Sequence, residues 1–229
     1  MTNKHPAMSK RAAAVRNALV IRNIDDLDEF ALCKEVRIQV FVEEQGFPLA
    51  AELDDLDDRC HHIVALLPAS LLTQIASSIA TVTTDNDHDA GLPLLPAVDP
   101  VASVLASQAS ESACKSAQAV TPAPYGADGD ATATESVVPV GTLRMYEYQP
   151  GVAKIGRVAV LPSLRGFRIG QHLMEEAHRI AAHQFRCQQV RVHAQYDKAE
   201  FYVKCGYEVP DPTQFMEDGY PHIVMVKQL

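Results

Sequence analysis

The chain has 229 residues, of which 47% are hydrophobic, and a formal net charge of −9 at pH 7. This length suits a single domain with a sizeable core, and no apolar run approaches the ~18 residues that would predict a membrane span. Eight acidic residues but only one base, Lys115, lie between Pro68 and Val138. The rest is therefore nearly neutral, which gives no support to nucleic-acid binding. Five cysteines without C-x-x-C spacing indicate reduced thiols in a cytoplasmic protein.

The N-terminal segment is basic, because Asp25 is the first acidic residue. No amphipathic pattern accompanies its charges, so a disordered basic tail is predicted over residues 1–17, with a mitochondrial presequence as the alternative. Residues 18–24 form a β-type run and predict the first strand. Asp25 and Asp26 then offer an N-cap for a helix that Gly46 ends. The residues that step along one face of this helix are Phe30, Cys33, Arg37, Val40 and Phe41.

An acidic loop at residues 52–59 precedes a second predicted strand at 62–67. From residue 68 to residue 138 the composition changes: Ala, Ser, Thr, Pro and Asp dominate, and periodicity is weak. Two apolar patches, Leu71–Val82 and Leu92–Leu105, can form local structure, and the remainder is predicted to be disordered or loosely packed. The segment is interpreted as an insertion between the second and third strands.

Order resumes with Val140–Tyr148, a run of period-two alternation, and the turn residues at 149–151 predict a hairpin with the strand that ends at Leu161. An amphipathic helix begins near Ile169. The residues that follow helical spacing on one face of it, all but the last of them apolar, are Ile169, Leu173, Ala177, Ile180, Ala181 and Gln184. Residues 18–229 are therefore interpreted as one domain, interrupted by the insertion. The fold is expected to be α+β (mixed α/β), a mostly antiparallel twisted sheet with flanking helices and one parallel β-α-β crossover. Its remaining elements are strands at 189–194, 207–209 and 222–226 and a short helix at 198–204.

The segment from Lys154 to Leu173 combines a strand, a glycine-containing turn and the start of a helix. Pro162 ends the strand, because proline cannot donate to a β-ladder. Unpaired N–H groups of the turn and the positive end of the helix dipole favour a bound phosphate. The turn, Arg165–Gly170, matches neither a Walker A loop nor G-x-G-x-x-G. Taken alone, the segment is also compatible with a plain strand-to-helix connection.

Several segments resemble motifs of the GNAT superfamily of N-acetyltransferases, and they occur in that family's order. Arg165–Gly170 resembles motif A, Arg/Gln-x-x-Gly-x-Gly/Ala, with Arg168 in place of the middle glycine. Phe201–Tyr207 resembles motif B, and Gly141–Arg144 resembles the entry to the third strand. Three further segments resemble the ElaA/YjcF-like branch of this superfamily. They are Val40–Gln45, the acids at 52, 54 and 57, and Gly219–Met225.

The resemblance implies acetyl-CoA as co-substrate. Its pyrophosphate would bind main-chain N–H groups of Arg165, Gly166, Phe167, Arg168, Ile169 and Gly170, and the Arg168 side chain would either hinder this approach or add a contact. The pantetheine arm and the oxyanion would contact main-chain groups of Val158, Ala159 and Val160. Tyr202 is implied as the general acid for the departing thiolate, because a phenol stays protonated at neutral pH. A tyrosine that only anchors the core is the alternative.

An acceptor amine arrives protonated at neutral pH, so the reaction also needs a base. Glu44, with Glu43 beside it, is a candidate through the resemblance, and an exposed helix-end carboxylate is the alternative. His222 is a candidate because it follows a turn at the start of the last strand, although a strand histidine is more often structural. Asp54 and Asp57 either attract a cationic amine or cap and solvate a loop.

No metal site is expected, because adjacent residues such as His61 and His62 point to opposite faces of a strand. The sequence predicts an acetyl-CoA-dependent N-acetyltransferase that acts on a primary amine of a small molecule or peptide by direct attack in a ternary complex. Two alternatives stay open: a non-catalytic acyl-CoA-binding module, which the departure at Arg168 favours, and an interaction protein that acts through its acidic insertion. Neither nucleic acid nor membrane is expected as a partner, and GNAT relatives offer the precedent of a homodimer.

Overall fold

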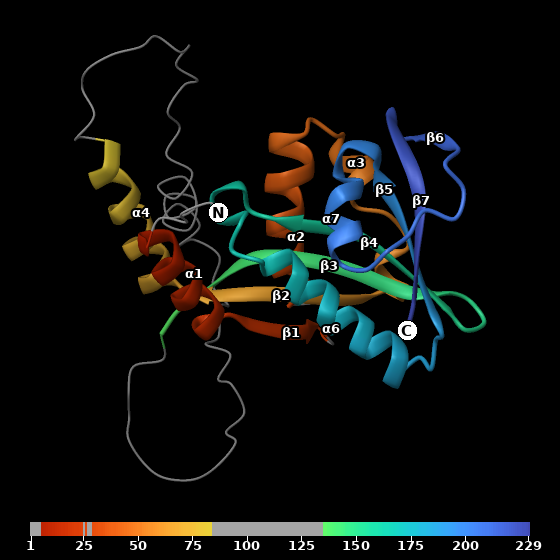
Figure 1. The fold of residues 1–229 in the computed structure, drawn as a ribbon, viewed down its shortest axis with the longest axis horizontal. Helices are drawn as coiled ribbons and strands as arrows, with labels where there is room; N and C mark the ends of the chain where they lie inside the picture. The colour runs from red at the N-terminus through yellow and green to blue at the C-terminus, as the bar shows by residue number, and fades with distance from the viewer. Residues whose placement is uncertain (1–5, 25, 27–28, 84–134) are drawn as a thin grey trace. The chain divides into compact units, whose positions relative to one another are not determined.

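The computed structural model describes residues 6–24, 26, 29–83 and 135–229. The chain divides into two compact units, Met1–Leu66 with Pro139–Leu229, and Leu67–Val138. Strands of the described residues form a seven-stranded sheet in the order β1-β2-β3-β4-β5-β7-β6 (Figure 1). The strands are β1 (Val20–Ile24), β2 (His61–Pro68), β3 (Val137–Gln149), β4 (Val152–Val160), β5 (Gln189–Gln195), β6 (Gln214–Glu217) and β7 (Tyr220–Gln228).

The described helices range from single turns to fifteen residues. The α-helices are α1 (Pro6–Ala18), α2 (Phe30–Arg37), α3 (Leu49–Glu52), α4 (Ala69–Thr83), α6 (Ile169–His183) and α7 (Ala199–Lys204). Helix α2 continues directly into a π-helix, η1 (Ile38–Glu44). Single 3-10 turns lie at η2 (Asp57–Arg59), η3 (Pro162–Leu164) and η4 (Tyr196–Lys198). None of these helices combines the length and the hydropathy needed to traverse a lipid bilayer.

The pairing of the strands confirms the predicted fold class. Strands β3 and β4 form the predicted antiparallel hairpin, and β1–β2, β5–β7 and β6–β7 are also antiparallel. Strands β4 and β5 are parallel, and α6 connects them, as expected of a β-α-β crossover. The sheet is therefore mixed but mostly antiparallel.

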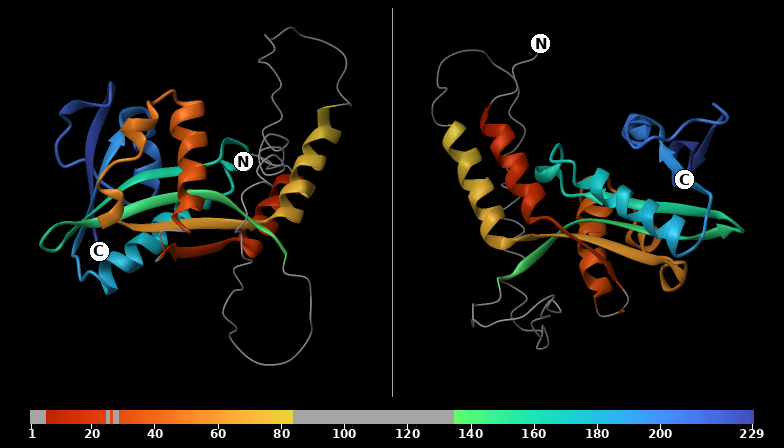
Figure 2. Two further views of the ribbon diagram at one scale, coloured as in Figure 1. Left: turned by 180° about the vertical axis from the view of Figure 1, so that it is seen from behind. Right: turned by 60° about the horizontal axis from the view of Figure 1, so that its bottom comes forward.

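Helices α2 and α6 cover opposite faces of this sheet (Figures 1 and 2). Gly141 of β3 lies directly under α6, because an added Cβ would be only 3.1 Å from the Leu173 Cδ1 atom. Side chains alternate along a strand, so Leu143 also points toward α6, whereas Thr142 and Arg144 point to the α2 face. Thr142 and Arg144 are thus gathered on the α2 face.

The buried stripe of α6 matches the sequence pattern. Its buried residues are Ile169, Leu173, Met174, Ala177, Ile180 and Ala181, and the predicted face lacked only Met174. Complete burial of one such Leu or Ile side chain contributes roughly 1.5–3 kcal/mol. Gln184, the polar end of the predicted stripe, is exposed beyond the last turn. The helix is therefore held by its apolar face, and its N-terminus is fixed next to β4.

Three sequence predictions about elements are wrong. Residues 6–18 form α1, whose Val15 is fully buried, so the predicted disorder fails there, because an Ala-rich segment is a good helix former; residues 1–5 lie outside the described part. Helix α2 begins at Phe30 after Glu29, without a side-chain cap, rather than at the aspartates at 25 and 26.

The third error concerns the strand expected at 207–209, which is a single bridge between Glu208 and Val226. Pro210 and Pro212 follow it and cannot donate to a ladder. The edge strand is instead β6, which pairs with β7 around the turn at Asp218 and Gly219.

The insertion lies where the sequence predicted, since β2 ends at Pro68 and β3 begins at Val137. Helix α4 covers the first apolar patch, with Leu72 and Ile75 buried. The Ala69 N–H donates to the Ser136 carbonyl (2.9 Å), which joins the two ends of the segment. The second patch, Leu92–Leu105, and the stretch predicted to be disordered lie outside the described residues.

Candidate active site

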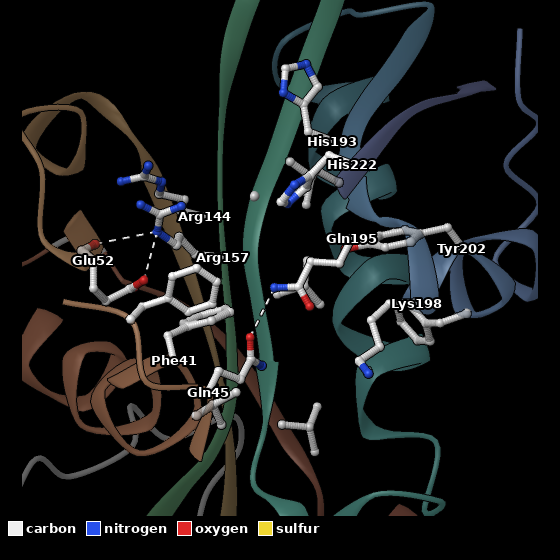
Figure 3. Close-up of a pocket in the computed structure, with 18 of the residues that line it drawn as sticks. Phe41, Gln45, Glu52, Arg144, Arg157, His193, Gln195, Lys198, Tyr202 and His222 are labelled. Carbon is white, nitrogen blue, oxygen red and sulfur yellow. Dashed lines mark hydrogen bonds and ion pairs between the residues drawn. The ribbon is translucent and has the colours of Figure 1, made fainter. Parts of the chain in front are cut away.

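A cavity of about 1100 Å³ opens on the α2 face of the sheet, within the first unit (Figure 3). It forms where β4 and β5 stop pairing: their parallel register ends at the pair Ile155–Val192. Main-chain groups of β4 beyond Ile155 therefore lack a partner on β5 and can pair with a ligand. A bulge contributes, because Arg157 has a left-handed φ of 51° and the β3–β4 register shifts beside it.

Of the predicted strand contacts, Val158 and Val160 line the cavity. Ala159 is 3% exposed, pairs with Thr142 of β3 and does not line the cavity. The volume exceeds the roughly 300–1,000 Å³ of common small-molecule sites. The cavity is thus large enough for two substrates at once.

The predicted phosphate loop forms one end of the cavity. Gly166, Arg168, Ile169 and Gly170 line it, as does Arg165, whereas Phe167 does not. Gly166 has a φ of 89°, and Arg168, the N-cap of α6, is left-handed with a φ of 67°. A left-handed backbone costs a residue other than glycine roughly 1–2 kcal/mol. This cost explains why the motif that the loop resembles has glycine at the position of Arg168.

Gly170 fixes the distance between this loop and α7. A Cβ at Gly170 would lie 3.1 Å from the Cε2 atom of Phe201, closer than side chains normally pack. Since Phe201 directly precedes Tyr202, the loop and the predicted general acid are held against each other by this contact.

Tyr202 lines the cavity and is positioned by aromatic packing. Its ring meets those of Phe201 and Tyr207 edge-on, with centroids 5.1 Å and 5.8 Å away. The Tyr207 hydroxyl in turn lies 2.9 Å from the His178 Nε2 atom. Burial raises the pKa of Tyr202 above its ordinary value, so the phenol is protonated at neutral pH and can donate a proton.

Glu44 and Arg165 form a bidentate pair at the edge of the loop. Nη1 and Nη2 of Arg165 donate to the two carboxylate oxygens, each at 2.6 Å, and Nε donates to the Val160 carbonyl (3.0 Å). Glu44 is not among the residues that line the cavity. We call Val158–Val160, Arg165–Gly170 and Tyr202 the loop side of the cavity.

The opposite wall rests on a buried network of three arginines and three carboxylates, Arg37, Arg144, Arg157, Glu52, Asp54 and Asp57. Arg144 donates to Asp54 at 2.6 Å and to Asp57 at 2.7 Å. The hydrogen bond from Arg144 lowers the pKa of Asp54. Burial would raise the pKa of Asp57, but hydrogen bonds from Arg37 and Arg144 outweigh it and lower the pKa.

The charges of this network balance, so Asp54 and Asp57 hold the wall together and are already neutralised by arginines. Arg144 and Arg157 both reach the cavity from it (Figure 3). Of the two interpretations of these aspartates, the structure favours the loop-stabilising one.

Two histidines lie beyond this network. The His193 Nδ1 atom is 2.7 Å from the Glu217 Oε2 atom and 3.3 Å from the Lys154 Nζ atom. The Nδ1 atom of His222 is 3.0 Å from the Tyr220 carbonyl oxygen. The hydrogen bond from His193 lowers the pKa of Glu217, and burial lowers that of Lys154. We call Lys154, His193, Glu217 and His222, which all line the cavity, the histidine side.

Sequence reasoning found His222 but missed His193, Glu217 and Lys154. The alternation of β5 could have shown His193, because the polar residues Gln189, Arg191, His193 and Gln195 alternate with buried ones. Glu217 could not be found, because its strand was not predicted. In the described part of the chain, His, Cys, Asp and Glu side chains form no group of three suited to a metal ion.

A pair of amides crosses the cavity between its two walls. The Gln195 Nε2 atom donates to the Gln45 Oε1 atom at 3.0 Å (Figure 3). The rings of Phe47 and Tyr220 pack beside it, with centroids 4.9 Å apart. The end of η1 is thereby joined to β5 and to the β6–β7 turn.

Comparison with known proteins bears on this arrangement. A family profile described as Acetyltransferase (GNAT) domain matches residues 131–209. Protein ElaA of Escherichia coli is 36% identical over 75 residues, which are 33% of this chain and 48% of ElaA. The uncharacterized N-acetyltransferase YjcF of Bacillus subtilis is 33% identical over 89 residues, 39% of this chain and 62% of YjcF. Residues 131–209 of the chain are thus similar to GNAT acetyltransferases.

Solved GNAT structures share the fold. The crystal structure of E. coli ElaA has a TM-score of 0.53 at 18% identity and covers 91% of this chain and 99% of that one. An acyl-CoA N-acyltransferase from Pseudomonas aeruginosa gives 0.53 at 20% identity, with the same coverage. The matched segments span about half to three-fifths of the curated relatives. The predicted GNAT resemblance, including its ElaA-like relatives, is thus confirmed.

Proposed function

We propose that this GNAT protein is an acetyl-CoA-dependent N-acetyltransferase that acts on a primary amine by direct attack in a ternary complex. The observation that carries the proposal is a single cavity that brings together the Arg165–Gly170 loop, the unpaired end of β4 and Tyr202. A substrate with a diphosphate at one end and a thioester at the other fits this order of groups.

The loop side would bind the coenzyme mainly through its main chain. Amides from Gly166 to Gly170, at the N-terminus of the fifteen-residue helix α6, suit a diphosphate, whereas the Arg165 N–H donates to the Pro162 carbonyl (3.3 Å). Arg165 would exchange Glu44 for phosphate. Arg168 is compatible with binding, because its Nε donates to the Gln171 Oε1 atom (2.7 Å), which ties the side chain to the first turn of α6.

The reaction would take place where β4 is unpaired. The amine nitrogen attacks the thioester carbonyl carbon, the C–S bond breaks, and Tyr202 gives its proton to the thiolate. Main-chain N–H groups of Val158–Val160 would stabilise the oxyanion. A covalent acetyl-enzyme is not invoked, since burial raises the pKa of the Cys205 thiol and disfavours the nucleophilic thiolate.

The histidine side would receive the amine, since a base must take a proton from the ammonium group. Of the two bases predicted from the sequence, His222 lines the cavity. Both carboxylate oxygens of Glu44 accept hydrogen bonds from Arg165. Glu44 would therefore become available as a base only when its ion pair with Arg165 is broken.

Calorimetry with coenzyme A and a thiol-release assay test the proposal together. The assay uses acetyl-CoA with benzylamine, histamine, spermidine and a lysine-containing peptide as acceptors. We expect coenzyme A to bind and at least one amine to be acetylated. Coenzyme binding without transfer to any amine would leave the acyl-CoA-binding alternative, and no heat of binding would rule out both.

A further inference from the structure

We propose that His193, oriented by Glu217, is the base that takes the proton from the acceptor amine. The inference rests on the proposed acetyl transfer and assigns a group that the sequence motifs do not include. Strand register puts these residues on one face of the sheet. Gln195 lies opposite His222 and His222 opposite Phe215, and His193 and Glu217 are each two residues from that row, in opposite directions, so they share its face. Their side chains meet across the row, with Nδ1 of His193 2.7 Å from Oε2 of Glu217.

The hydrogen bond to Glu217 determines which nitrogen of His193 is free. An ionised carboxylate can only accept, so at 2.7 Å the Nδ1 atom must carry the proton. The Nε2 atom then keeps its lone pair. Among the described residues none is hydrogen-bonded to this Nε2 atom, and the side chain is 23% exposed at the cavity wall. A carboxylate that orients an imidazole in this way also stabilises the imidazolium formed when Nε2 takes a proton.

Charged groups from the neighbouring strands act on the ring in opposite directions. The Lys154 ammonium on β4 is 3.3 Å from Nδ1, and Arg191 lies opposite Lys154 in the register. Glu217 on β6 supplies the compensating negative charge. His222 on β7 also acts on Glu217, so the carboxylate is shared by three potential cations.

The other two candidate bases have weaker geometry for this role. His222 donates from Nδ1 to a neutral main-chain carbonyl at 3.0 Å, which stabilises an imidazolium less than a carboxylate does. Glu44 has both oxygens engaged by Arg165 and does not line the cavity. His193 therefore combines a free lone pair, a counter-charge and access to the cavity.

The proton balance of the reaction is complete with these groups. The ammonium nitrogen loses two protons as the amide forms. His193 takes the first through Nε2 and passes it to solvent. The second replaces the proton that Tyr202 gives to the thiolate, so both side chains return to their starting state.

The first test is His193→Gln, assayed from pH 6 to pH 10 with the acceptor of highest turnover in the amine panel. General-base catalysis contributes about 10²–10⁴-fold, so we expect kcat/KM at neutral pH to fall at least about 100-fold. The remaining rate should rise with pH in proportion to the neutral amine, and coenzyme A affinity should be unchanged. Glu217→Gln should lose about tenfold, and the double variant should be no worse than His193→Gln, because Glu217 acts as a positioning residue through His193.

His183→Gln is the matched control, since His183 is exposed at the end of α6, and it should behave as wild type. In His222→Gln the pH dependence of kcat/KM should follow that of wild type, whereas in His193→Gln it should follow the neutral amine alone. The reverse result, a wild-type pH dependence in His193→Gln and its loss in His222→Gln, would overturn the assignment in favour of His222. Wild-type protein that binds coenzyme A but acetylates none of the amines would refute acetyl transfer itself and this assignment with it.

A second measurement does not depend on the acceptor. Nitrogen-15 spectra of the histidine side chains report which ring nitrogen is protonated. We expect the Nδ1–H tautomer for neutral His193 and a change of that signal in Glu217→Gln. The Nε2–H tautomer in wild type would contradict the proposal even if His193→Gln were inactive.

Discussion

The loop side of the cavity is built mainly from main-chain groups, whereas the histidine side is built from side chains on four strands, β4 to β7. Apart from Tyr202 on α7, the loop side follows one continuous stretch, Val158 to Gly170, whose turns and helix start can be seen in the sequence. The histidine side arises only when separate strands are brought into register. The comparison indicates that the proposed coenzyme site is encoded locally, while the proposed acceptor site depends on the folded sheet. Substitutions at four positions test it.

The largest effect, on the free energy of unfolding, is expected in the network of arginines and carboxylates that supports the wall opposite the loop side. Asp57→Asn leaves Arg37 and Arg144 without their shared carboxylate, and breaking a buried ion pair costs about 3–5 kcal/mol. Urea unfolding at pH 7 should show this loss. Because the pKa of Asp57 is lowered on folding, its contribution is complete above about pH 4 and is lost as the pH falls through the folded-state pKa.

In acid, the free energy of unfolding should therefore change less with pH in Asp57→Asn than in wild type. Asp58→Asn is the matched control, because Asp58 is the exposed neighbour, and it should change stability by less than about 0.5 kcal/mol. A loss below 1 kcal/mol in Asp57→Asn would show that the wall does not depend on this network.

The next largest effect is expected at Tyr202, the one side chain of the loop side with a proposed chemical role. Tyr202→Phe removes the phenol and keeps the ring that packs on Phe201 and Tyr207. We expect kcat to fall about 100-fold, with coenzyme A affinity unchanged by calorimetry. Tyr196→Phe, at a 50% exposed tyrosine outside the cavity, serves as control. A wild-type kcat in Tyr202→Phe would reduce Tyr202 to a packing residue.

A smaller effect is expected from Gly170→Ala, which tests whether main-chain approach limits coenzyme binding. The new methyl group would meet the Phe201 ring at 3.1 Å, and overpacking of this kind costs about 1–3 kcal/mol. Coenzyme A affinity should weaken about tenfold. Phe201→Leu in the same chain makes room and should restore part of the affinity; no restoration would mean that the contact is not the cause.

The smallest effect separates the charge of Arg168 from its backbone. Arg168→Gly relieves the left-handed conformation, whereas Arg168→Ala keeps it, so the glycine variant should be more stable by about 0.5–1 kcal/mol. If main-chain amides dominate binding, both variants should bind coenzyme A within about threefold of wild type. A loss of tenfold or more in both would instead assign the guanidinium a direct role in binding.

The sequence was informative wherever local pattern determines structure. The β3–β4 hairpin, the stripe of α6 and the loop at Arg165–Gly170 follow from alternation, helical spacing and turn residues, and family comparison confirmed the resemblance to GNAT proteins. The histidine side could not be predicted, because His193 and Glu217 lie on separate strands that come together only in the folded sheet. Strand β6 has four residues, too few for its alternation to be recognised in the sequence. The buried role of Arg37 was equally invisible, since its partners are fifteen and twenty residues away.

The amide pair between Gln45 and Gln195 has a consequence for the size of molecule that can enter. One neutral hydrogen bond contributes only about 0.5–1.5 kcal/mol, which corresponds to at most about a tenfold change in occupancy. A long chain that threads between the two glutamines thus loses little by displacing them. Under the proposed function, this weak contact would exclude neither a compact amine nor an extended peptide, and discrimination between them would have to come from the walls on either side.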